Sequence, residues 1–380
     1  MLDLLSFTLP ELQQQLVQGG FSPTQASRLW QALYRQPTVP LSELSGITPS
    51  LRDFLQTRAT LAATHVRRVV RSADGLADKF LLGLSDGRQV EAVLMRFPGR
   101  VTACVSSQVG CALGCVFCAT GQEGWQRDLT AGEIVAQVRF LDGRLAEEAH
   151  GVAPACGPAS DRPARGLRGS RRPAAQRLRN VVLMGMGEPL LNYEAVMTAC
   201  DILCDSAGLA LAARRITVST VGVIPGIVRL AEEERGCSLA VSLHAATQAE
   251  RAALLPVARS WPLDELLVAC RYYTRRLGRR IFFEWTLIDG INDTREHARQ
   301  LAELLDDLPA HVNLIPLNPT SGYDGVAGTT PAARQFQAVL TAAGIPSTVR
   351  QRRGVEIAAG CGQLAGESAS ASQEKNETAF

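Results

Sequence analysis

The chain has 380 residues, 46% of them hydrophobic and 20% charged, and its 39 basic and 37 acidic side chains leave a formal net charge of +2. This length predicts two or three domains and excludes a small disulfide-stapled protein, and the balanced charge gives no overall sign of nucleic-acid binding. The longest uncharged stretch, residues 101–122, contains several polar side chains. It does not match the run of about 20 apolar residues that spans a membrane, so we expect a soluble protein.

Residues 1–62 are predicted to form a small helical accessory domain. The Ser-Pro pair at 22–23 and the Thr-Pro pair at 48–49 each place a capping side chain before a first-turn proline, which predicts a helix start. Such a domain can contact nucleic-acid backbone through helix N-termini, although simple packing is the plainer interpretation. Residues 1–16 carry no basic leader before an apolar core, so we expect no secretory signal and a cytoplasmic location.

Residues 63–99 are predicted to form a β-hairpin extension that links this domain to the rest of the chain. The β-prone runs at 79–84 and 89–95 flank the sequence Ser-Asp-Gly, which is a good hairpin turn. We therefore expect two or three antiparallel strands in this segment.

From residue 100 to residue 365, β-prone runs alternate with helical stretches. This alternation is typical of an α/β fold in which a parallel sheet closes into a (β/α) barrel or a partial barrel. The β-prone runs are residues 101–105, 180–184, 215–219, 238–242, 281–288, 311–317 and 347–350.

Two segments are predicted to be disordered. Residues 143–179 are rich in Ala, Gly, Pro and Arg, and the arginines of the second half are opposed only by Asp161, so we interpret the segment as a basic insertion in a surface loop. Contact with RNA and simple solvation explain such a loop equally well. Residues 366–380 form a polar tail.

The ten cysteines are better explained as metal ligands, catalytic thiols or buried small side chains than as disulfides, because we expect a reducing compartment. Cys111, Cys115 and Cys118 form a CxxxCxxC set just after the strand at 101–105. Three thiolates on one loop can bind three irons of a 4Fe-4S cluster and leave the fourth iron open. A structural zinc site would need a fourth ligand, usually from a second CxxC pair, which the sequence lacks. Buried structural cysteines remain the alternative.

The cysteine set, with Phe117 before its last member, resembles the signature of the radical S-adenosylmethionine superfamily, in which the cofactor chelates the open iron. Four segments sharpen this likeness, because in their order they resemble the RlmN family, which methylates adenine carbon 2 in ribosomal and transfer RNA. They are CVSSQVGC at 104–111, GMGEP at 185–189, SLH at 242–244 and CGQLAG at 361–366. The resemblance covers residues 65–366 and is weaker in the helical N-terminus, and the 143–179 insertion departs from the family pattern.

The resemblance implies a partial (β/α) barrel of the radical S-adenosylmethionine type that holds one 4Fe-4S cluster and S-adenosylmethionine. Most of the motifs follow a predicted strand, at the end where barrel enzymes build their sites. Alone, each polar position is a weak signal, because a polar residue after a strand is commonly a helix cap. The implied cofactor contacts are Gly187, Glu188, Ser219, Ser242, Leu243, His244 and Asn318.

Adenine carbon 2 is electrophilic, so attack on the methyl sulfonium cannot methylate it directly. The resemblance implies that one S-adenosylmethionine methylates Cys361 and that a second, cleaved reductively, gives a 5'-deoxyadenosyl radical that removes hydrogen from this methyl group. The resulting methylene radical adds to the base and forms a protein–RNA adduct. Glu91 matches the residue that acts as the base in the family. Cys104 matches the thiol that releases the product by forming a disulfide with Cys361. From strand alternation alone, Glu91 would be a surface carboxylate, and both thiols could be inert buried side chains.

The implied partners are 23S rRNA and tRNA as substrates and an electron donor such as flavodoxin with its reductase, with no membrane. The nearest alternative is the carbon-8 methylating relative, and Val109 before Gly110 resembles the carbon-2 group instead. A noncatalytic RNA-binding protein with a structural metal site is an alternative of another class. A radical enzyme that acts on a protein or a small molecule leaves the paired Cys104 and Cys361 unexplained.

Overall fold

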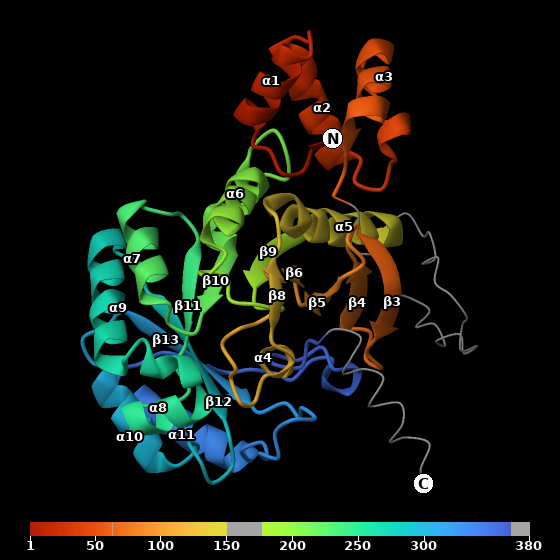
Figure 1. The fold of residues 1–380 in the computed structure, drawn as a ribbon. Helices are drawn as coiled ribbons and strands as arrows, with labels where there is room; N and C mark the ends of the chain where they lie inside the picture. The colour runs from red at the N-terminus through yellow and green to blue at the C-terminus, as the bar shows by residue number, and fades with distance from the viewer. Residues whose placement is uncertain (63, 150–176, 366–380) are drawn as a thin grey trace.

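The computed structural model describes residues 1–62, 64–149 and 177–365 (Figure 1). In these ranges the main sheet has ten strands in the spatial order β14-β13-β12-β11-β10-β9-β6-β5-β4-β3. Neighbours from β6 to β14 pair parallel, whereas β3, β4, β5 and β6 pair antiparallel. The strands are β3 (His65–Arg71), β4 (Ala77–Gly83), β5 (Gln89–Phe97), β6 (Arg100–Cys104), β9 (Leu178–Leu183), β10 (Ile216–Thr220), β11 (Ser238–Ser242), β12 (Ile281–Leu287), β13 (Ala310–Pro316) and β14 (Ser347–Val349).

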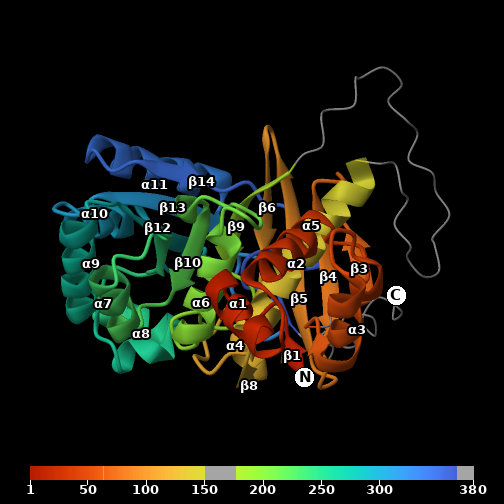
Figure 2. The same ribbon diagram turned by 90° about the horizontal axis from the view of Figure 1, so that it is seen from above.

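Helices cover one side of the parallel strands (Figures 1 and 2). In the described part of the chain, β14 and β3 are the two ends of the strand order, so the sheet stays open as a partial barrel. The predicted α/β fold class is confirmed. In Figure 2, α7, α9 and α10 form the outer rim beside β10 to β13. Among the described residues, no helix is long and apolar enough to cross a bilayer. The helices of this layer are α5 (Ala131–Ala149), α6 (Tyr193–Cys204), α7 (Ile224–Glu232), α9 (Leu263–Leu277), α10 (Arg295–Leu304) and α11 (Thr330–Ala342). The short helix α8 (Gln248–Leu254) packs instead against residues 113–117.

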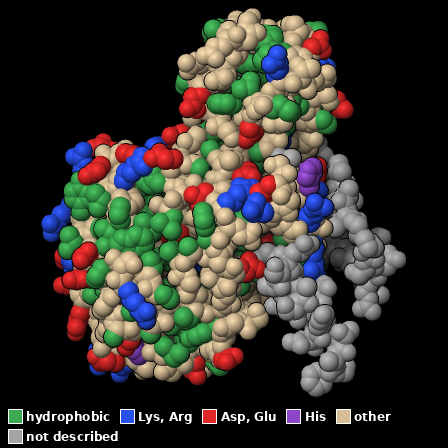
Figure 3. Space-filling model, viewed as in Figure 1, with side chains coloured by type: hydrophobic (Ala, Val, Ile, Leu, Met, Phe, Trp, Pro, Cys, Tyr) green, Lys and Arg blue, Asp and Glu red, His purple; other side chains and the backbone are tan. Residues whose placement is uncertain are grey.

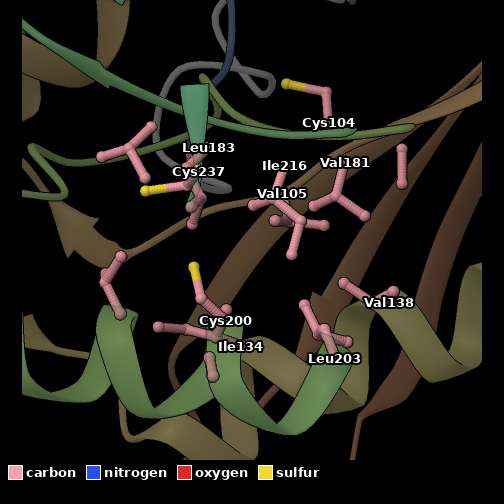
Figure 4. Packing of buried hydrophobic residues seen from close by; sticks show 14 of the residues in the cluster. Cys104, Val105, Ile134, Val138, Val181, Leu183, Cys200, Leu203, Ile216 and Cys237 are labelled. Atoms are coloured by element: carbon pink, nitrogen blue, oxygen red, sulfur yellow. The ribbon is translucent and has the colours of Figure 1, made fainter. Parts of the chain in front are cut away.

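The core between sheet and helices follows the alternation of the strands. Ile134 and Val138 on α5 and Leu203 on α6 pack toward the strands, from which Val181 points to them (Figure 4). Cys104 ends β6 and points to the opposite side, away from this helical layer. Successive residues of a strand face opposite sides, so the apolar neighbours of Cys104 fill the core while its thiol faces the inside of the barrel.

The N-terminal segment forms α1 (Leu9–Gln18), α2 (Pro23–Arg35) and α3 (Pro49–Arg58) and lies above α5 and α6 in Figure 1. The predicted caps are present, because Ser22 accepts the N–H of Gln25 and Thr48 accepts the N–H of Leu51. α1 begins with a capping box between Thr8 and Glu11, a start signal that sequence reasoning passed over. No local pattern indicates the parallel pairing of β1 (Leu2–Asp3) with β2 (Ala59–Thr60). The division of the chain into domains at residues 62 and 99 stays a prediction.

The antiparallel strands β3, β4 and β5 confirm the expected hairpin extension, and they continue the main sheet through the pairing of β5 with β6. The predicted bounds of the basic insertion were too wide at both ends. Residues 143–149 belong to α5, where Leu145 is buried and Arg144 pairs with Glu147, and residues 178–179 begin β9. Small residues in this part of α5 serve close packing, because Gly143 lies against Thr38. The rest of the insertion and the tail at 366–380 lie outside the described residues.

Candidate active site

The three cysteines of the CxxxCxxC set lie on a loop between β7 (Gln108–Gly110) and α4 (Ala119–Glu123). β7 pairs antiparallel with β8 (Trp125–Asp128), so a short hairpin closes the loop. At Gly110 the backbone has a φ of +73° and lies against the Gly124 carbonyl, which leaves no room for a side chain. The backbone N–H of Cys111 donates to the Gly124 carbonyl over 3.0 Å, and that of Val116 donates to the Leu254 carbonyl of α8 over 3.1 Å. The loop is therefore held at its start and against α8.

Burial raises the pKa of all three thiols, and that of Cys111 reaches about 12. The thiols are also close enough that a negative charge on Cys118 raises the pKa of Cys111 and Cys115 further. Three adjacent buried thiols ionise only with a cationic partner, which iron supplies. Among the described residues, no three His, Cys, Asp or Glu side chains converge on a single metal ion. A 4Fe-4S cluster needs no such convergence because each thiolate binds a different iron, so the loop fits this cluster.

A cavity of about 150 Å³ opens beside Cys115 and Cys118 at the carboxyl ends of β9 to β13. Asn318 lines it with a buried side-chain oxygen that has no hydrogen-bond partner among the described residues. This orphan acceptor and the adjacent cysteine loop fit a polar ligand such as S-adenosylmethionine. Leu243 does not line the cavity, because its side chain is fully buried in the hydrophobic core. The other predicted cofactor contacts all line it: Gly187, Glu188, Ser219, Ser242, His244 and Asn318.

Glu188 fixes the turn after β9 with both carboxylate oxygens. Oε1 accepts the N–H of Leu190 over 3.1 Å and Oε2 accepts the N–H of Val221 over 2.9 Å, whereas the Glu188 N–H donates to Gln108 Oε1 over 2.8 Å. Burial raises the pKa of Glu188 to about 7. A cationic group bound in the cavity would favour the ionised carboxylate.

His244 is a neutral imidazole in this wall. Burial, assisted by the charge of Arg251, lowers its pKa to about 3. Nδ1 accepts the N–H of Thr286 over 2.9 Å, so the ring hydrogen resides on Nε2. The ring meets Phe117 edge to face at a centroid distance of 5.0 Å, which connects the strand ends with the cysteine loop.

A second cavity of about 460 Å³ reaches through the inside of the barrel and is lined by Cys104 and Cys361. Figure 3 shows charges of both signs interspersed over one face of the molecule, whereas cations gather in this cavity. The two cavities share the lining residues Met184, Glu284, Ile315, Asn318 and Cys361. The arginines that line the second cavity are Arg100, Arg214, Arg215, Arg350, Arg352 and Arg353.

Cys361 stands where the two cavities meet. Its carbonyl accepts Asn318 Nδ2 over 3.0 Å, and the Gly362 carbonyl accepts the N–H of Ala119 on α4 over 2.8 Å. The side chain is exposed to the cavities and surrounded by protein beyond them, so burial raises its pKa; Glu284 adds to this rise and Arg350 opposes it. Burial raises the pKa of Cys104, and a negative charge on Cys361 raises it further. The two thiols are therefore close enough to interact electrostatically across the second cavity.

Glu91 is buried, so the surface position that strand alternation favoured is wrong. Cys104 is paired with Val93, two residues along β5, and therefore faces the same side of the sheet as Glu91. Glu91 Oε1 lies 2.9 Å from Lys79 Nζ, and Oε2 accepts the N–H of Ala365 over 2.9 Å. Burial raises its pKa, and Lys79 opposes the rise. Glu91 thus lies beside the Cys361 loop but lines neither of the two cavities.

Sequence reasoning missed two charged groups beside the predicted site residues. Lys79 on β4 pairs with Glu91, and it follows Asp78 in a strand whose other residues are apolar or Gly. Glu284 interrupts the apolar strand β12, is buried, and its Oε1 accepts Asn313 Nδ2 over 2.8 Å. A charged residue within a buried strand is the signal that could have identified both.

Comparisons with known proteins place the chain among RNA-modifying enzymes. A scan against models of protein families gives no match. The chain is 55% identical over 370 residues to the probable dual-specificity RNA methyltransferase RlmN 2 of Opitutus terrae, covering 96% of this chain and 86% of the relative. It is 52% identical over 362 residues to the dual-specificity RNA methyltransferase RlmN 1 of Myxococcus xanthus, covering 95% and 94%. A radical SAM methyltransferase from Sphaerobacter thermophilus superposes with a TM-score of 0.86 at 43% identity, covering 96% and 99%.

Proposed function

The chain belongs to the RlmN family of dual-specificity RNA methyltransferases, and on that premise we propose that it methylates carbon 2 of adenosine in 23S rRNA and tRNA through Cys361 and Cys104. The observation that carries this proposal is the position of Cys361 between the two cavities. One cavity adjoins the cysteine loop, and the other is basic and holds Cys104. A methyl carrier between a cofactor and an RNA base needs access to both.

As a radical SAM methyltransferase, the protein uses a 4Fe-4S cluster and S-adenosylmethionine. Cys111, Cys115 and Cys118 would hold the cluster, and the polar wall from Gly187 to Asn318 would hold S-adenosylmethionine. When bound, these groups supply an electrophilic methyl group and a radical able to abstract hydrogen. The chain's own task is to place Cys361 within reach and to keep water from the reacting atoms.

Cys361 accepts the methyl group as a thiolate, because the thiol is a poor nucleophile. Burial and Glu284 raise its pKa, so the positive charge of Arg350, which lowers the pKa, assists ionisation. Asn318 and the N–H of Ala119 hold the backbone carbonyls of Cys361 and Gly362. The loop therefore presents the methyl group from a fixed position.

Addition of the methylene radical to adenine leaves one unpaired electron on the adduct. Glu91 takes the ring proton, and the unpaired electron would return to the oxidised cluster that supplied the first electron, which leaves a closed-shell thioether between Cys361 and the base. In the release step, the Cys104 thiolate bonds to the Cys361 sulfur as the bond from Cys361 to the methylene carbon breaks. That carbon keeps the electron pair and takes up the proton that Cys104 gave up. The placement of both thiols in one cavity supports this disulfide. The contact of Glu91 with Ala365 keeps the base beside the Cys361 loop.

RNA fits the second cavity on charge grounds, because its arginines can contact phosphates. The target adenine has to leave its stack to reach Cys361. An electron donor such as flavodoxin with its reductase and a cytoplasmic location complete the proposal.

The test is anaerobic reconstitution with iron and sulfide, followed by incubation with reductant, S-adenosylmethionine and unmodified 23S rRNA or tRNA. Mass spectrometry of the digested nucleosides then identifies the product. We expect 2-methyladenosine from both RNAs and none from Cys361→Ala. A product of 8-methyladenosine would assign the chain to carbon-8 chemistry instead. An intact cluster without RNA methylation would overturn the proposed RNA substrate. A chain that binds zinc and no iron would overturn the proposed enzymatic activity.

A further inference from the structure

Arg251 on α8 is a fully buried cation with unused hydrogen-bond donors. Its Nη2 donates to the carbonyl of Val221, but Nε and Nη1 have no partner among the described residues. A guanidinium has five N–H donors and is rarely buried without anionic partners, because its desolvation costs more than one neutral hydrogen bond returns. Burial lowers the pKa of Arg251 only to about 10, so it remains a cation at neutral pH.

The helix that carries Arg251 lies against the cysteine loop. The carbonyl of Leu254 on α8 accepts the N–H of Val116, and the Leu254 side chain packs in one apolar cluster with Cys115. A negative charge on Cys115 would act on Arg251 more strongly than any other charge around it. The Val221 backbone forms hydrogen bonds to both Arg251 and Glu188: its carbonyl accepts from Arg251, and its N–H donates to Glu188. Arg251 thus belongs to the same hydrogen-bonded frame as the cofactor cavity.

The other ionisable groups that interact with Arg251 do not meet the need for an anion, and one of them, His244, is a neutral imidazole. Cys270 on α9 also faces Arg251, but burial raises its pKa to about 12 even with this arginine beside it, so it is a neutral thiol. Cys115 becomes a thiolate once it binds iron. Among the groups beside Arg251, the iron-bound Cys115 is therefore the one that supplies negative charge without a further proton change.

We propose that Arg251 is a charge-compensating and positioning residue of the iron–sulfur centre, whose unused N–H groups partner the cluster on the side of Cys115. This inference rests on the proposed function, since it requires the cluster. A cluster bound by three thiolates becomes more negative on reduction, so a buried cation and N–H donors beside it favour the reduced state. Arg251 would therefore raise the reduction potential as well as retain the iron.

A purely structural role for Arg251 makes a different prediction. If the bond to Val221 were its whole purpose, Arg251→Met would lower the unfolding temperature equally with and without the cluster. In the charge-compensating role, the cluster-free protein carries an unpaired buried cation. Arg251→Met then leaves the unfolding temperature of the cluster-free protein unchanged or raises it, and lowers that of the reconstituted protein.

The experiment compares wild type, Arg251→Met, Arg251→Lys and Arg259→Met, all reconstituted anaerobically without S-adenosylmethionine. Arg259 is the matched control because it is exposed in the turn after α8. Iron and sulfide per chain, their loss to a chelator, and the redox titration followed by electron paramagnetic resonance are measured. The unfolding temperature is recorded with and without cluster.

We expect Arg251→Met to lose iron faster and to show at least a tenfold lower ratio of reduced to oxidised cluster at a fixed potential, which is about 59 mV for one electron. Arg251→Lys keeps the charge and shifts the potential less, and Arg259→Met behaves as wild type. If Arg251→Met fails to fold, the neutral variant Arg251→Gln is measured instead, and a potential and an iron retention equal to those of wild type overturn the inference. Equal potentials and iron retention in Arg251→Met overturn it directly. Wild type that assembles no cluster would instead overturn the proposed function.

Discussion

Replacing Lys79 with methionine removes the cationic partner of the buried Glu91 while keeping a side chain of similar length. Lys79 Nζ lies 2.9 Å from Glu91 Oε1, and the two side chains are 13% and 6% exposed. Breaking a buried ion pair on one side costs roughly 3–5 kcal/mol, because the remaining charge is uncompensated. The N–H of Ala365 still donates to Glu91 Oε2 and offsets part of this cost. We therefore expect Lys79→Met to lower the free energy of unfolding by about 3 kcal/mol, the lower end of that range.

The loss depends on pH with a defined sign. Burial already raises the pKa of Glu91 and Lys79 opposes the rise, so removing Lys79 raises the folded-state pKa further. An acid whose pKa rises on folding adds no penalty below its unfolded pKa, and the penalty grows as the pH increases towards the folded value. The variant should therefore lose little stability near pH 5 and much more near pH 8.

The assay is the unfolding temperature of the reconstituted protein at both pH values, alongside the pH–rate profile of RNA methylation. Because the base must be ionised, the acidic limb of the profile moves to higher pH in Lys79→Met. Lys79→Arg keeps the charge and should retain most stability, and the double variant Lys79→Met with Glu91→Gln should regain stability without activity. An equal loss at both pH values with an unmoved profile would refute the reasoning.

Three further outcomes are expected. Cys104→Ala should trap the protein–RNA adduct, seen as a covalent species on denaturing gels, and free 2-methyladenosine from this variant would contradict the role of the thiol. Burial raises the pKa of Glu188 from 4.5 to about 7, so the ligand-free protein should lose about 3 kcal/mol between pH 4.5 and 7, and Glu188→Gln should abolish that part of the pH dependence in titrations followed by urea unfolding. Arg214→Ala with Arg215→Ala should weaken RNA binding and reduce the salt dependence of log Kd by one to two phosphate contacts, whereas an unchanged slope would remove these arginines from the RNA path.

The order of the strands along the chain and the cysteine motif were predictable, because each depends on residues that are close together in the sequence. Alternating β-prone and helical runs reproduce β6 and β9 to β14 but not the short strands β7 and β8, and CxxxCxxC has a spacing that few other structures need. The SLH segment also held a usable signal. Strand alternation places Ser242 and His244 on one side and Leu243 on the other, as found for the cavity and the core.

The rest depends on contacts between distant segments. Glu91 is buried because the Cys361 loop covers the inner face of β5. Strand alternation shows which residues share a face, but it does not show whether that face is buried or exposed to solvent. The pairing of β1 with β2 joins two-residue strands from opposite ends of the N-terminal segment, which leaves no local pattern. Arg251 looks like an ordinary surface residue of a short helix until the cysteine loop is seen to pack over it.

Cluster binding and the position of Cys361 are mechanically linked in this fold. α4 follows Cys118 directly, and the N–H of Ala119 at its start donates to the Gly362 carbonyl next to Cys361. Iron that fixes Cys118 would therefore also fix Ala119, which holds the loop of Cys361, the proposed methyl acceptor. Asn318 closes the link, because its Nδ2 holds the Cys361 carbonyl while its Oδ1 is unused toward the cofactor cavity. A ligand that engages this oxygen would orient the same amide that positions Cys361, so cofactor occupancy and methyl transfer geometry are set by one side chain.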